Sequence, residues 1–307
     1  MLDLRPVFFI VGLMVSALGV AMFIPMIVDL LYNDYSWRAF GISGILTALF
    51  GGSLALSTYT PNPDMRAREA FLLTVLSWVS LSIFAAVPFI MEPLKLSITD
   101  ALFEATSGIT TTGSTVLLGL DDMPKGILMW RSILQWIGGI GIVVTAMAVL
   151  PMLKIGGMQL FRLESSDMGE KILPKAASLA AGISGIYFTL TVLCMFGYIA
   201  TGMNSFDAIS HAMTTLATGG FSTSDTSMGG FMDNGADLVC IFFMMSAAIP
   251  FGVYLLIITR GDWIAPLRDS QVRAFIALIL TLIAVVTLYL WLNSELTRSR
   301  ALRLSAF

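Results

Sequence analysis

The chain has 307 residues, of which 57% are apolar and 12% are charged, with a formal net charge of −3 and a mean hydropathy of +0.86. These values are typical of a membrane protein and exclude an ordinary soluble domain, and the negative balance offers no basic surface for nucleic acid. A single histidine, together with two cysteines that lack a CxxC spacing and lie in apolar runs, argues against a metal or disulfide framework.

Apolar segments long enough to cross about 30 Å of hydrocarbon recur along the chain. They are predicted at 6–31, 37–58, 70–91, 127–153, 176–201, 236–259 and 274–292. The first is too long for a signal-peptide core, so we interpret it as a retained span with a kink at Pro25.

Two short polar stretches stand between these spans, and they repeat each other at a constant shift of 107 residues. The first pore segment (110–115) reads TTTGST, and the second pore segment (217–222) reads ATGGFS. Each follows a short amphipathic helix, predicted over 97–109 and 204–216. Backbone carbonyls in such a turn can coordinate a dehydrated cation, and irregular backbone at membrane depth is tolerated where it lines a watery cavity. The two segments therefore predict a pore.

The distribution of basic residues predicts the orientation of the chain. With a cytoplasmic N-terminus, the outer segments carry Lys95 and Lys125, and the loop 202–235 has neither Lys nor Arg. The inner segments would hold Arg5, Arg66, Arg68, Lys154, Arg162, Lys171, Lys175, Arg260, Arg268 and Arg273. We therefore expect a cytoplasmic N-terminus and pore segments that enter from outside, although three arginines between 298 and 303 fall on the outer side.

Several longer stretches resemble the membrane subunit of the Trk/Ktr/HKT superfamily of potassium transporters, closest to its TrkH-like bacterial members. In chain order they are ITDALFE (98–104), SGITTTG (107–113), LQWIGGIGI (134–142), GGMQL (156–160) and GGFST (219–223). They cover the chain nearly end to end, which is more specific than any one of them.

The resemblance implies an all-α polytopic membrane protein in which helix–pore loop–helix repeats surround one cation pore. It divides the chain into two N-terminal transmembrane helices (1–60), a first repeat (61–155), a second repeat (156–262) and the first helix of an incomplete third repeat (263–307). The family has four repeats, so we expect the chain to be truncated at its C-terminus. The implied function is potassium uptake across the bacterial cytoplasmic (inner) membrane, which is not an enzymatic activity.

The resemblance also implies partners. They are K⁺ as the transported ion, the lipid bilayer, a second copy in a homodimer and a cytoplasmic nucleotide-binding regulatory subunit. In the family, a serine in place of the glycine at position 113 accompanies Na⁺ permeation, so Gly113 favours K⁺ over Na⁺.

Carbonyl and hydroxyl oxygens of the pore segments are the predicted K⁺ ligands, because stripping water from K⁺ needs a ring of oxygens. The residues are Thr110, Thr111, Thr112, Gly113, Thr218, Gly219 and Gly220. The short helices before them would direct the negative ends of their dipoles towards the cation.

Polar residues near the pore segments form a supporting set. Asp100 and Asp207 are expected to cap the short helices, with a cation-attracting outer mouth as the alternative. Glu104 is expected to be a buried hydrogen-bond partner of the pore backbone, and His211 a packed polar residue. Arg131 could either reach the membrane interface or pair with an acid near the pore, and the sequence favours neither.

Two other functions are considered. The chain could be a non-conducting fragment, or a half-pore that needs missing repeats or dimerisation. An intramembrane enzyme has little support, because the sequence shows no Ser/His pair, HExxH motif or pair of aspartates with catalytic spacing, and a hydrolase would have to work with a single histidine. The glycines at 138, 139 and 141 follow no strand and lie in a predicted span, which excludes a dinucleotide loop and favours close helix packing.

Overall fold

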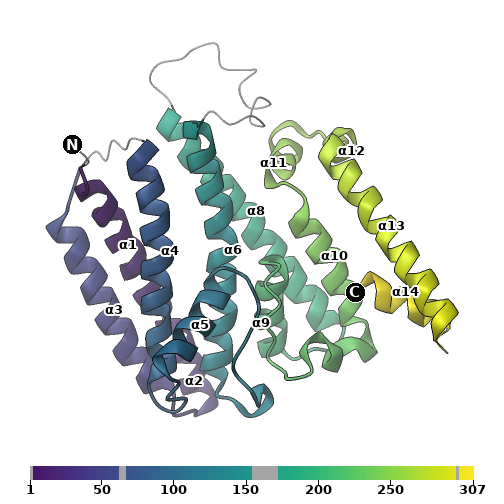
Figure 1. Ribbon diagram of the computed structural model, residues 1–307, viewed down its shortest axis with the longest axis horizontal. Coiled ribbons are helices and arrows are strands. Elements are labelled where there is room, and N and C mark those ends of the chain that lie inside the picture. The colour runs from purple at the N-terminus through teal and green to yellow at the C-terminus, as the bar shows by residue number, and fades with distance from the viewer. Residues whose placement is uncertain (1–2, 62–66, 154–171, 295–296) are drawn as a thin grey trace. The chain divides into compact units, whose positions relative to one another are not determined.

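Figure 1 shows the computed structural model of the chain, which describes residues 3–61, 67–153, 172–294 and 297–307. Side chains are described in these ranges except at 67, 142–153, 172–178 and 233. The described residues form helices and irregular connections without any β-strand, which confirms the all-α class. The GGMQL stretch (156–160) and the basic connector around it lie outside the described residues.

The helices follow the order expected for spans alternating with short pore helices. Before the first pore segment lie α1 (Arg5–Ala21), α2 (Phe23–Tyr32), α3 (Trp37–Ser57), α4 (Ala67–Ile90) and α5 (Ile98–Ile109). Between the pore segments lie η1 (Leu120–Asp122), α6 (Lys125–Leu153), α8 (Ile172–Ala200) and α9 (Ser205–Leu216). After the second come η2 (Ser227–Asn234), α10 (Ala236–Ala248), α11 (Phe251–Arg260), α12 (Ala265–Arg268), α13 (Ser270–Asn293) and α14 (Arg298–Ala306).

Several described helices are long and apolar enough to cross a membrane. They are Arg5–Tyr32, Trp37–Ser57, Arg68–Ile90, Leu179–Ala200 and Ser270–Asn293. The first of them is interrupted at Met22, close to the expected kink at Pro25, whose missing N–H removes a hydrogen bond from this turn. The predicted span at 127–153 corresponds to α6, although the side chains of its second half lie outside the description.

The segment predicted as a span over 236–259 is not one straight helix. Helices α10 and α11 are bent by 84° at Ile249 and Pro250. Proline has no N–H, so the carbonyl of Ser246 loses its usual donor four residues later. That carbonyl instead accepts the N–H of Ile249 at 3.3 Å and the hydroxyl of Tyr254 at 2.7 Å, so it remains satisfied at the bend.

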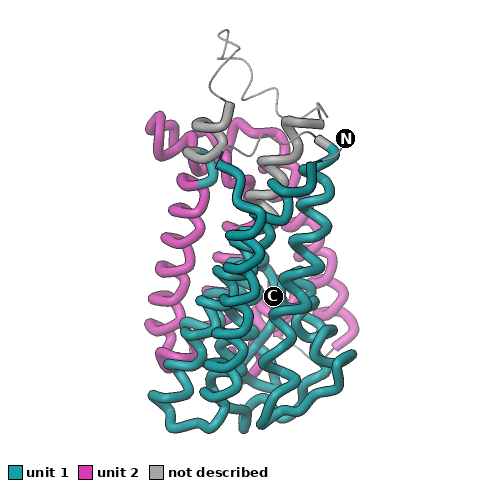
Figure 2. The backbone as a smooth tube through the Cα atoms, turned by 90° about the vertical axis from the view of Figure 1, so that its left-hand side faces the viewer, with its two compact units in different colours: residues 1–180, 209–227 teal, residues 181–208, 228–307 magenta. Residues whose placement is uncertain are grey.

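The described contacts divide the chain into two compact units, which Figure 2 distinguishes by colour. Unit 1 contains residues 1–180 and 209–227, and unit 2 contains residues 181–208 and 228–307. Both pore segments belong to unit 1. The division therefore does not follow the predicted boundaries at 60, 155 and 262, which stay a prediction.

In unit 1, helices α1 and α3 pack backbone against backbone through glycines. An ideal Cβ at Gly12 would lie 2.6 Å from the backbone nitrogen of Ala55, and one at Gly51 would overlap the backbone of Ser16. Small residues at membrane helix interfaces allow this close approach, because van der Waals packing replaces the hydrophobic effect there. The two N-terminal spans therefore form a tightly packed pair.

In unit 2, the guanidinium of Arg303 on α14 pairs with the carboxylate of Asp237 at the start of α10. It also donates to the carbonyl of Met232. One of the arginines that disagree with the orientation rule thus has a buried acidic partner. Cys194 and Cys240 are buried, as expected of small hydrophobic residues.

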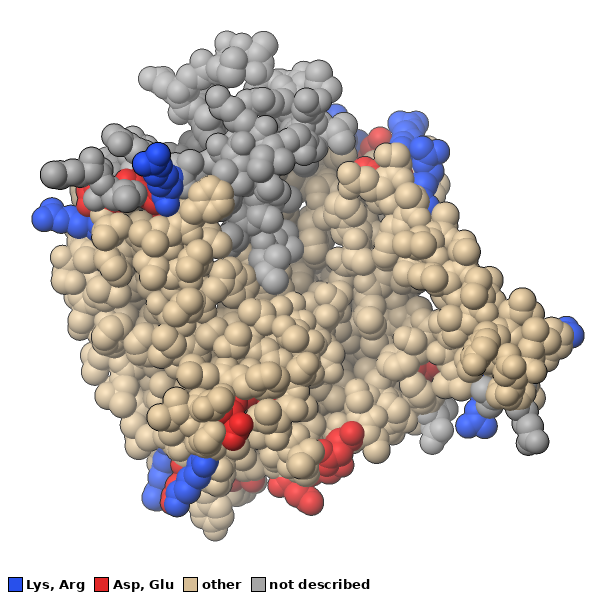
Figure 3. Space-filling view, viewed as in Figure 1, with Lys and Arg blue, Asp and Glu red and all other residues tan. Residues whose placement is uncertain are grey.

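Charged side chains on the face shown in Figure 3 gather mostly towards the two ends of the helices. The surface between them is largely uncharged, and many large apolar side chains on the spans are exposed, among them Leu49, Leu56 and Leu193. A band of this kind is the surface expected where lipid surrounds the spans.

Candidate cation filter

The two pore helices α5 and α9 begin with matching capping interactions. The hydroxyl of Ser97 accepts the N–H of Asp100 at 3.1 Å, and the amide oxygen of Asn204 accepts the N–H of Asp207 at 2.9 Å. Each aspartate carboxylate accepts a hydrogen bond back from the capping side chain. The expectation that Asp100 and Asp207 are the caps is therefore corrected. Ser97 and Asn204, three positions earlier, cap the helices, and each aspartate accepts a hydrogen bond from its capping residue.

The pore helices also end in the same way, at positions related by the shift of 107 residues. After α5, the N–H of Thr111 donates to Gly108 O at 3.0 Å and that of Thr112 to Ser107 O at 2.9 Å. After α9, Thr218 and Gly219 make the corresponding bonds to Thr215 O and Thr214 O at 3.0 and 2.9 Å. Each pore segment therefore leaves its helix through the same hydrogen-bonded turn.

In both pore segments, every second residue has a positive backbone angle φ. Thr111 and Gly113 have φ values of 55° and 81°, and Thr218 and Gly220 have 50° and 81°. Threonine rarely adopts positive φ, because its Cβ is crowded there, so strain of this kind marks a conformation held by its surroundings. Positive φ at every second residue can turn successive carbonyls towards one side, as a row of cation ligands requires.

The pore segments touch each other at their glycines. An ideal Cβ on Gly113 would overlap the carbonyl oxygen of Gly219, whereas one on Gly220 would meet nothing within 4 Å. Position 113 therefore requires glycine for its positive φ and also for its contact with the other segment. Position 220 requires it for φ alone.

Glu104 on α5 is completely buried and holds the end of the first pore segment. Its carboxylate accepts the hydroxyl of Thr115 at 2.9 Å and the N–H of Val116 at 3.0 Å. His211 on α9 occupies the equivalent position, and its Nε2 lies 2.9 Å from the hydroxyl of Ser222, the counterpart of Thr115. The same residue positions therefore join pore helix to pore segment in both repeats, through a carboxylate in one and an imidazole in the other.

Arg131 on α6 connects both pore segments. It is 1% exposed, and its Nε donates to the carboxylate of Glu104 at 2.7 Å while its Nη1 donates to the carbonyl of Ser222 at 2.9 Å. Its guanidinium also lies 4.1 Å from the ring centroid of Phe221. Of the two alternatives left open by the sequence, the structure shows the pairing with an acid.

Gln135, one helical turn after Arg131, holds the second pore segment from the same side of α6. Its Nε2 donates to the carbonyl of Gly219 at 2.7 Å, and its Oε1 accepts the N–H of Phe221 at 3.1 Å. A carbonyl oxygen has two lone pairs, so this bond leaves Gly219 one acceptor position. Close approach of α6 also needs Gly138, where a Cβ would overlap the carbonyl of Ile109 at the end of α5.

The remaining predicted ligand positions differ between the segments. The hydroxyl of Thr110 donates to Thr106 O at 2.6 Å and lies 2.8 Å from that of Thr112. The second segment has Ala217 in place of Thr110, so it has no counterpart of this hydroxyl. Thr112, Thr218 and Gly220 are exposed in unit 1, and Gly219 is buried.

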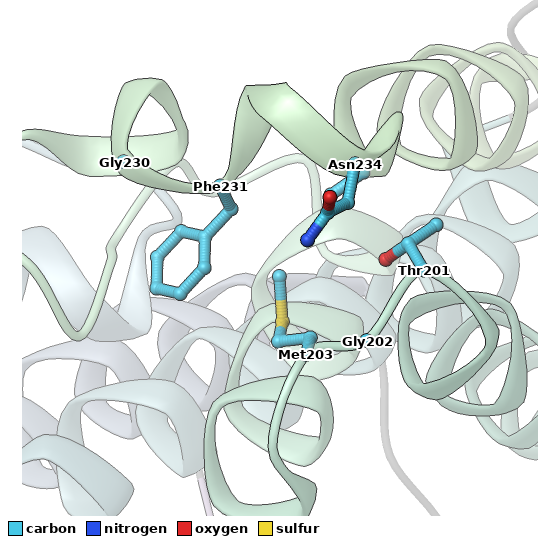
Figure 4. Close-up of a pocket in the computed structure, with 7 residues that line it drawn as sticks. Thr201, Gly202, Met203, Gly230, Phe231 and Asn234 are labelled. Atoms are coloured by element: carbon cyan, nitrogen blue, oxygen red, sulfur yellow. The ribbon is translucent and has the colours of Figure 1, made fainter.

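Figure 4 shows a separate cavity of about 150 Å³ in unit 2. The side chains of Met203, Phe231 and Asn234 point into it, and no charged residue lines it. It contains none of the predicted site residues, and among the described residues no group of three His, Cys, Asp or Glu could hold a metal ion. The cation site is therefore sought in the backbone of the pore segments.

Sequence reasoning did not assign a role to Gln135 or to the contact between Gly113 and Gly219. A signal for the first was present, because Arg131 and Gln135 are polar residues one turn apart in an apolar span, and such residues usually face the protein interior. The glycine contact depends on how the two repeats meet, which no local pattern encodes.

We expect Gln135→Ala to loosen the second pore segment. The change leaves the carbonyl of Gly219 and the N–H of Phe221 without their buried partner, which costs about 1–3 kcal/mol for each unsatisfied group. The melting temperature of the purified chain measures the effect. Gln271→Ala, at an exposed position on α13, is the matched control and should melt like the parent chain. Equal melting of both variants would contradict the role of Gln135.

The chain is similar over residues 37–297 to the family described as TrkH, cation transport protein. It is 39% identical over 286 residues to the Trk system potassium uptake protein TrkI of Halomonas elongata, covering 92% of this chain and 58% of the relative. It is 39% identical over 288 residues to the Trk system potassium uptake protein TrkH of Escherichia coli, covering 93% and 60%.

The fold is similar to the crystal structure of the potassium transporter TrkH from Vibrio parahaemolyticus. The TM-score is 0.91 at 34% sequence identity, over 99% of this chain and 63% of that one. The chain thus spans about three-fifths of the length of the relatives that it matches.

Proposed function

The chain belongs to the TrkH family of cation transport proteins, and from this premise we propose that it takes up K⁺ through a pore lined by its two pore segments. The relatives named as potassium uptake proteins support the choice of ion. The protein is a transporter and not an enzyme, and K⁺ is its cargo. We place it in the bacterial inner membrane, with its N-terminus in the cytoplasm.

The matched backbone of the two pore segments carries this proposal. Positive φ at Thr111, Gly113, Thr218 and Gly220 gives both segments one conformation suited to rows of carbonyls. The proposed ligands are the oxygens of residues 110–113 and 218–220. An ion that sheds water needs such oxygens already in place, since ordering them on binding would cost conformational entropy.

Selectivity for K⁺ over Na⁺ depends, in this proposal, on holding the two pore segments in a fixed position relative to each other. Gly113 has no room for a side chain beside Gly219. Buried hydrogen bonds of Arg131, Glu104 and Gln135 hold the segments in place. A rigid ring favours the larger ion because it cannot contract around the smaller one.

The partners are also proposals. We propose that the protein forms a homodimer in the lipid bilayer and binds a cytoplasmic nucleotide-binding regulatory subunit. The cytoplasmic connectors rich in Lys and Arg are where we expect that subunit to dock.

Rubidium uptake into vesicles that contain the purified chain tests the proposed function. We expect uptake that unlabelled K⁺ inhibits and Na⁺ inhibits weakly, and we expect Gly113→Asp and Gly220→Asp to abolish it. Uptake that both aspartate variants retain, with normal insertion, would contradict the pore segments as the path. No uptake by the parent chain would support the alternative of a non-conducting half-pore.

A further inference from the structure

We propose that Asp29 is a positioning residue for the cation filter, acting through the start of helix α6. The inference rests on the proposed function, because it concerns the geometry of the same pore segments. Asp29 lies in α2, within the N-terminal spans that precede the first repeat. Through Asp29, the N-terminal spans would contribute to ion selectivity.

The carboxylate of Asp29 is completely buried and holds the first turn of α6. Its Oδ1 accepts the N–H of Gly126 at 2.5 Å, and its Oδ2 accepts the hydroxyl of Ser36 at 2.5 Å. The neighbouring Asp34 accepts the N–H of Lys125 at 2.9 Å. The first N–H groups of a helix have no partner within it, and a carboxylate that satisfies them also favours the positive end of the helix dipole.

The fit of α6 against this carboxylate allows little movement. An ideal Cβ on Gly126 would overlap the carboxylate of Asp29, so only glycine brings the helix this close. Figure 1 shows α2 near the lower end of α6, and contacts between the two helices confirm that they are neighbours in unit 1.

The helix held in this way carries the residues that hold the filter. Arg131 and Gln135 lie five and nine residues after Gly126, or about 8 and 14 Å along the same helix. Arg131 bonds to Glu104 and Ser222, and Gln135 bonds to Gly219 and Phe221. A shift or rotation of α6 at its first turn would therefore move the hydrogen-bond donors behind both pore segments.

The support behind Asp29 is rigid. Helix α2 continues from α1, which packs against α3 through the glycine contacts described above. Phe40 on α3 makes an edge-to-face contact with Trp130 on α6, at 6.2 Å between ring centroids. The indole N–H of Trp130 donates to the carbonyl of Ala85 on α4 at 3.1 Å, so α6 is fixed on two sides next to Arg131.

Asp29→Ala and Asp29→Asn separate hydrogen bonding from charge. Alanine removes both acceptors, whereas an asparagine oxygen can still accept the N–H of Gly126 and its amide can donate to Ser36. Asp269→Ala is the matched control, because Asp269 caps α13 with its carboxylate in the same manner. Hydrogen–deuterium exchange of the full chain in detergent measures how well the backbone amides of residues 110–118 and 217–223 are protected, and it does not require transport.

We expect Asp29→Ala to speed exchange in both pore segments about tenfold or more, as for the loss of a buried hydrogen bond to a charged group. Asp29→Asn should restore the slow exchange, and Asp269→Ala should leave the pore segments unchanged. In the rubidium assay, Asp29→Ala should raise the KM for rubidium and weaken discrimination against Na⁺ more than it lowers the maximal rate.

Faster exchange confined to residues 124–128, with unchanged pore segments, would overturn the proposal.

Gly126→Ala provides a second test, since its methyl group should displace α6 only while Asp29 retains its carboxylate. The double variant Asp29→Ala/Gly126→Ala should therefore resemble Asp29→Ala alone, and full additivity would contradict the fit. If the parent chain shows no uptake, the proposed function fails, while the exchange experiment still decides the role of Asp29.

Discussion

Replacing Gly113 with alanine is expected to reduce rubidium uptake by at least about 100-fold. Two effects combine at this position. A φ of 81° costs an L-residue about 1–2 kcal/mol, and the new methyl group would overlap the carbonyl oxygen of Gly219. The overlap must move one pore segment away from the other, which enlarges or distorts the proposed ring of oxygens. We further expect the surviving uptake to discriminate less between K⁺ and Na⁺.

Two matched glycines separate these effects. Gly220 has the same φ of 81° at the equivalent place in the second pore segment, and Gly119 has a φ of 74° in the loop after the first. A Cβ at either position would meet nothing within 4 Å. Gly220→Ala should lose less uptake than Gly113→Ala, and Gly119→Ala should stay close to the parent. Equal losses for Gly113→Ala and Gly220→Ala would show that the contact with Gly219 is unimportant.

Replacing Glu104 with alanine is expected to destabilise the chain by about 3–5 kcal/mol, because it leaves the guanidinium of Arg131 buried without its partner. The same change frees the hydroxyl of Thr115 and the N–H of Val116. The loss of folded protein in the membrane and the melting temperature in detergent measure the effect. Asp100→Ala, on the same helix but in its first turn, is the matched control and should cost at most about 1 kcal/mol, because Ser97 still caps the helix and only the carboxylate is lost.

A double variant tests whether the ion pair acts as one unit. Glu104→Leu with Arg131→Met removes both charges, and a buried pair replaced by apolar residues often regains stability. We expect the double variant to be more stable than Glu104→Leu alone and still defective in uptake, because the pore segments lose their hydrogen bonds to both side chains. Additive destabilisation, or uptake that recovers with stability, would contradict this account.

The fold was largely predictable because a long apolar segment in lipid must satisfy its own backbone hydrogen bonds, which a helix does. The spans at 37–58, 70–91 and 274–292 correspond closely to α3, α4 and α13. The bend between α10 and α11 was missed, although Pro250 was visible, because transmembrane helices often accommodate proline without such a break. The division into two units depends on contacts far apart in the sequence, which span prediction does not supply.

The site was predictable where the sequence repeats itself. The shift of 107 residues located both pore segments before any contact was known, and the same shift relates Glu104 to His211. The residues that join the two repeats were harder to identify, because Gln135 and Arg131 reach the second pore segment across 84 and 91 positions of sequence. Asp29 was not considered as a functional residue, since a buried carboxylate near a span end gives no sign of which helix it holds.

Anomalous diffraction from crystals of the chain soaked in rubidium would show whether the two pore segments bind the cation. We expect an anomalous peak between the two pore segments, within coordination distance of carbonyl oxygens from residues 110–113 and 218–220, and weaker when K⁺ is added than when Na⁺ is added. We expect no such peak for Gly113→Asp. An ordered pore region without a peak at these oxygens, or a peak that persists in Gly113→Asp, would contradict binding of the cation by the pore segments.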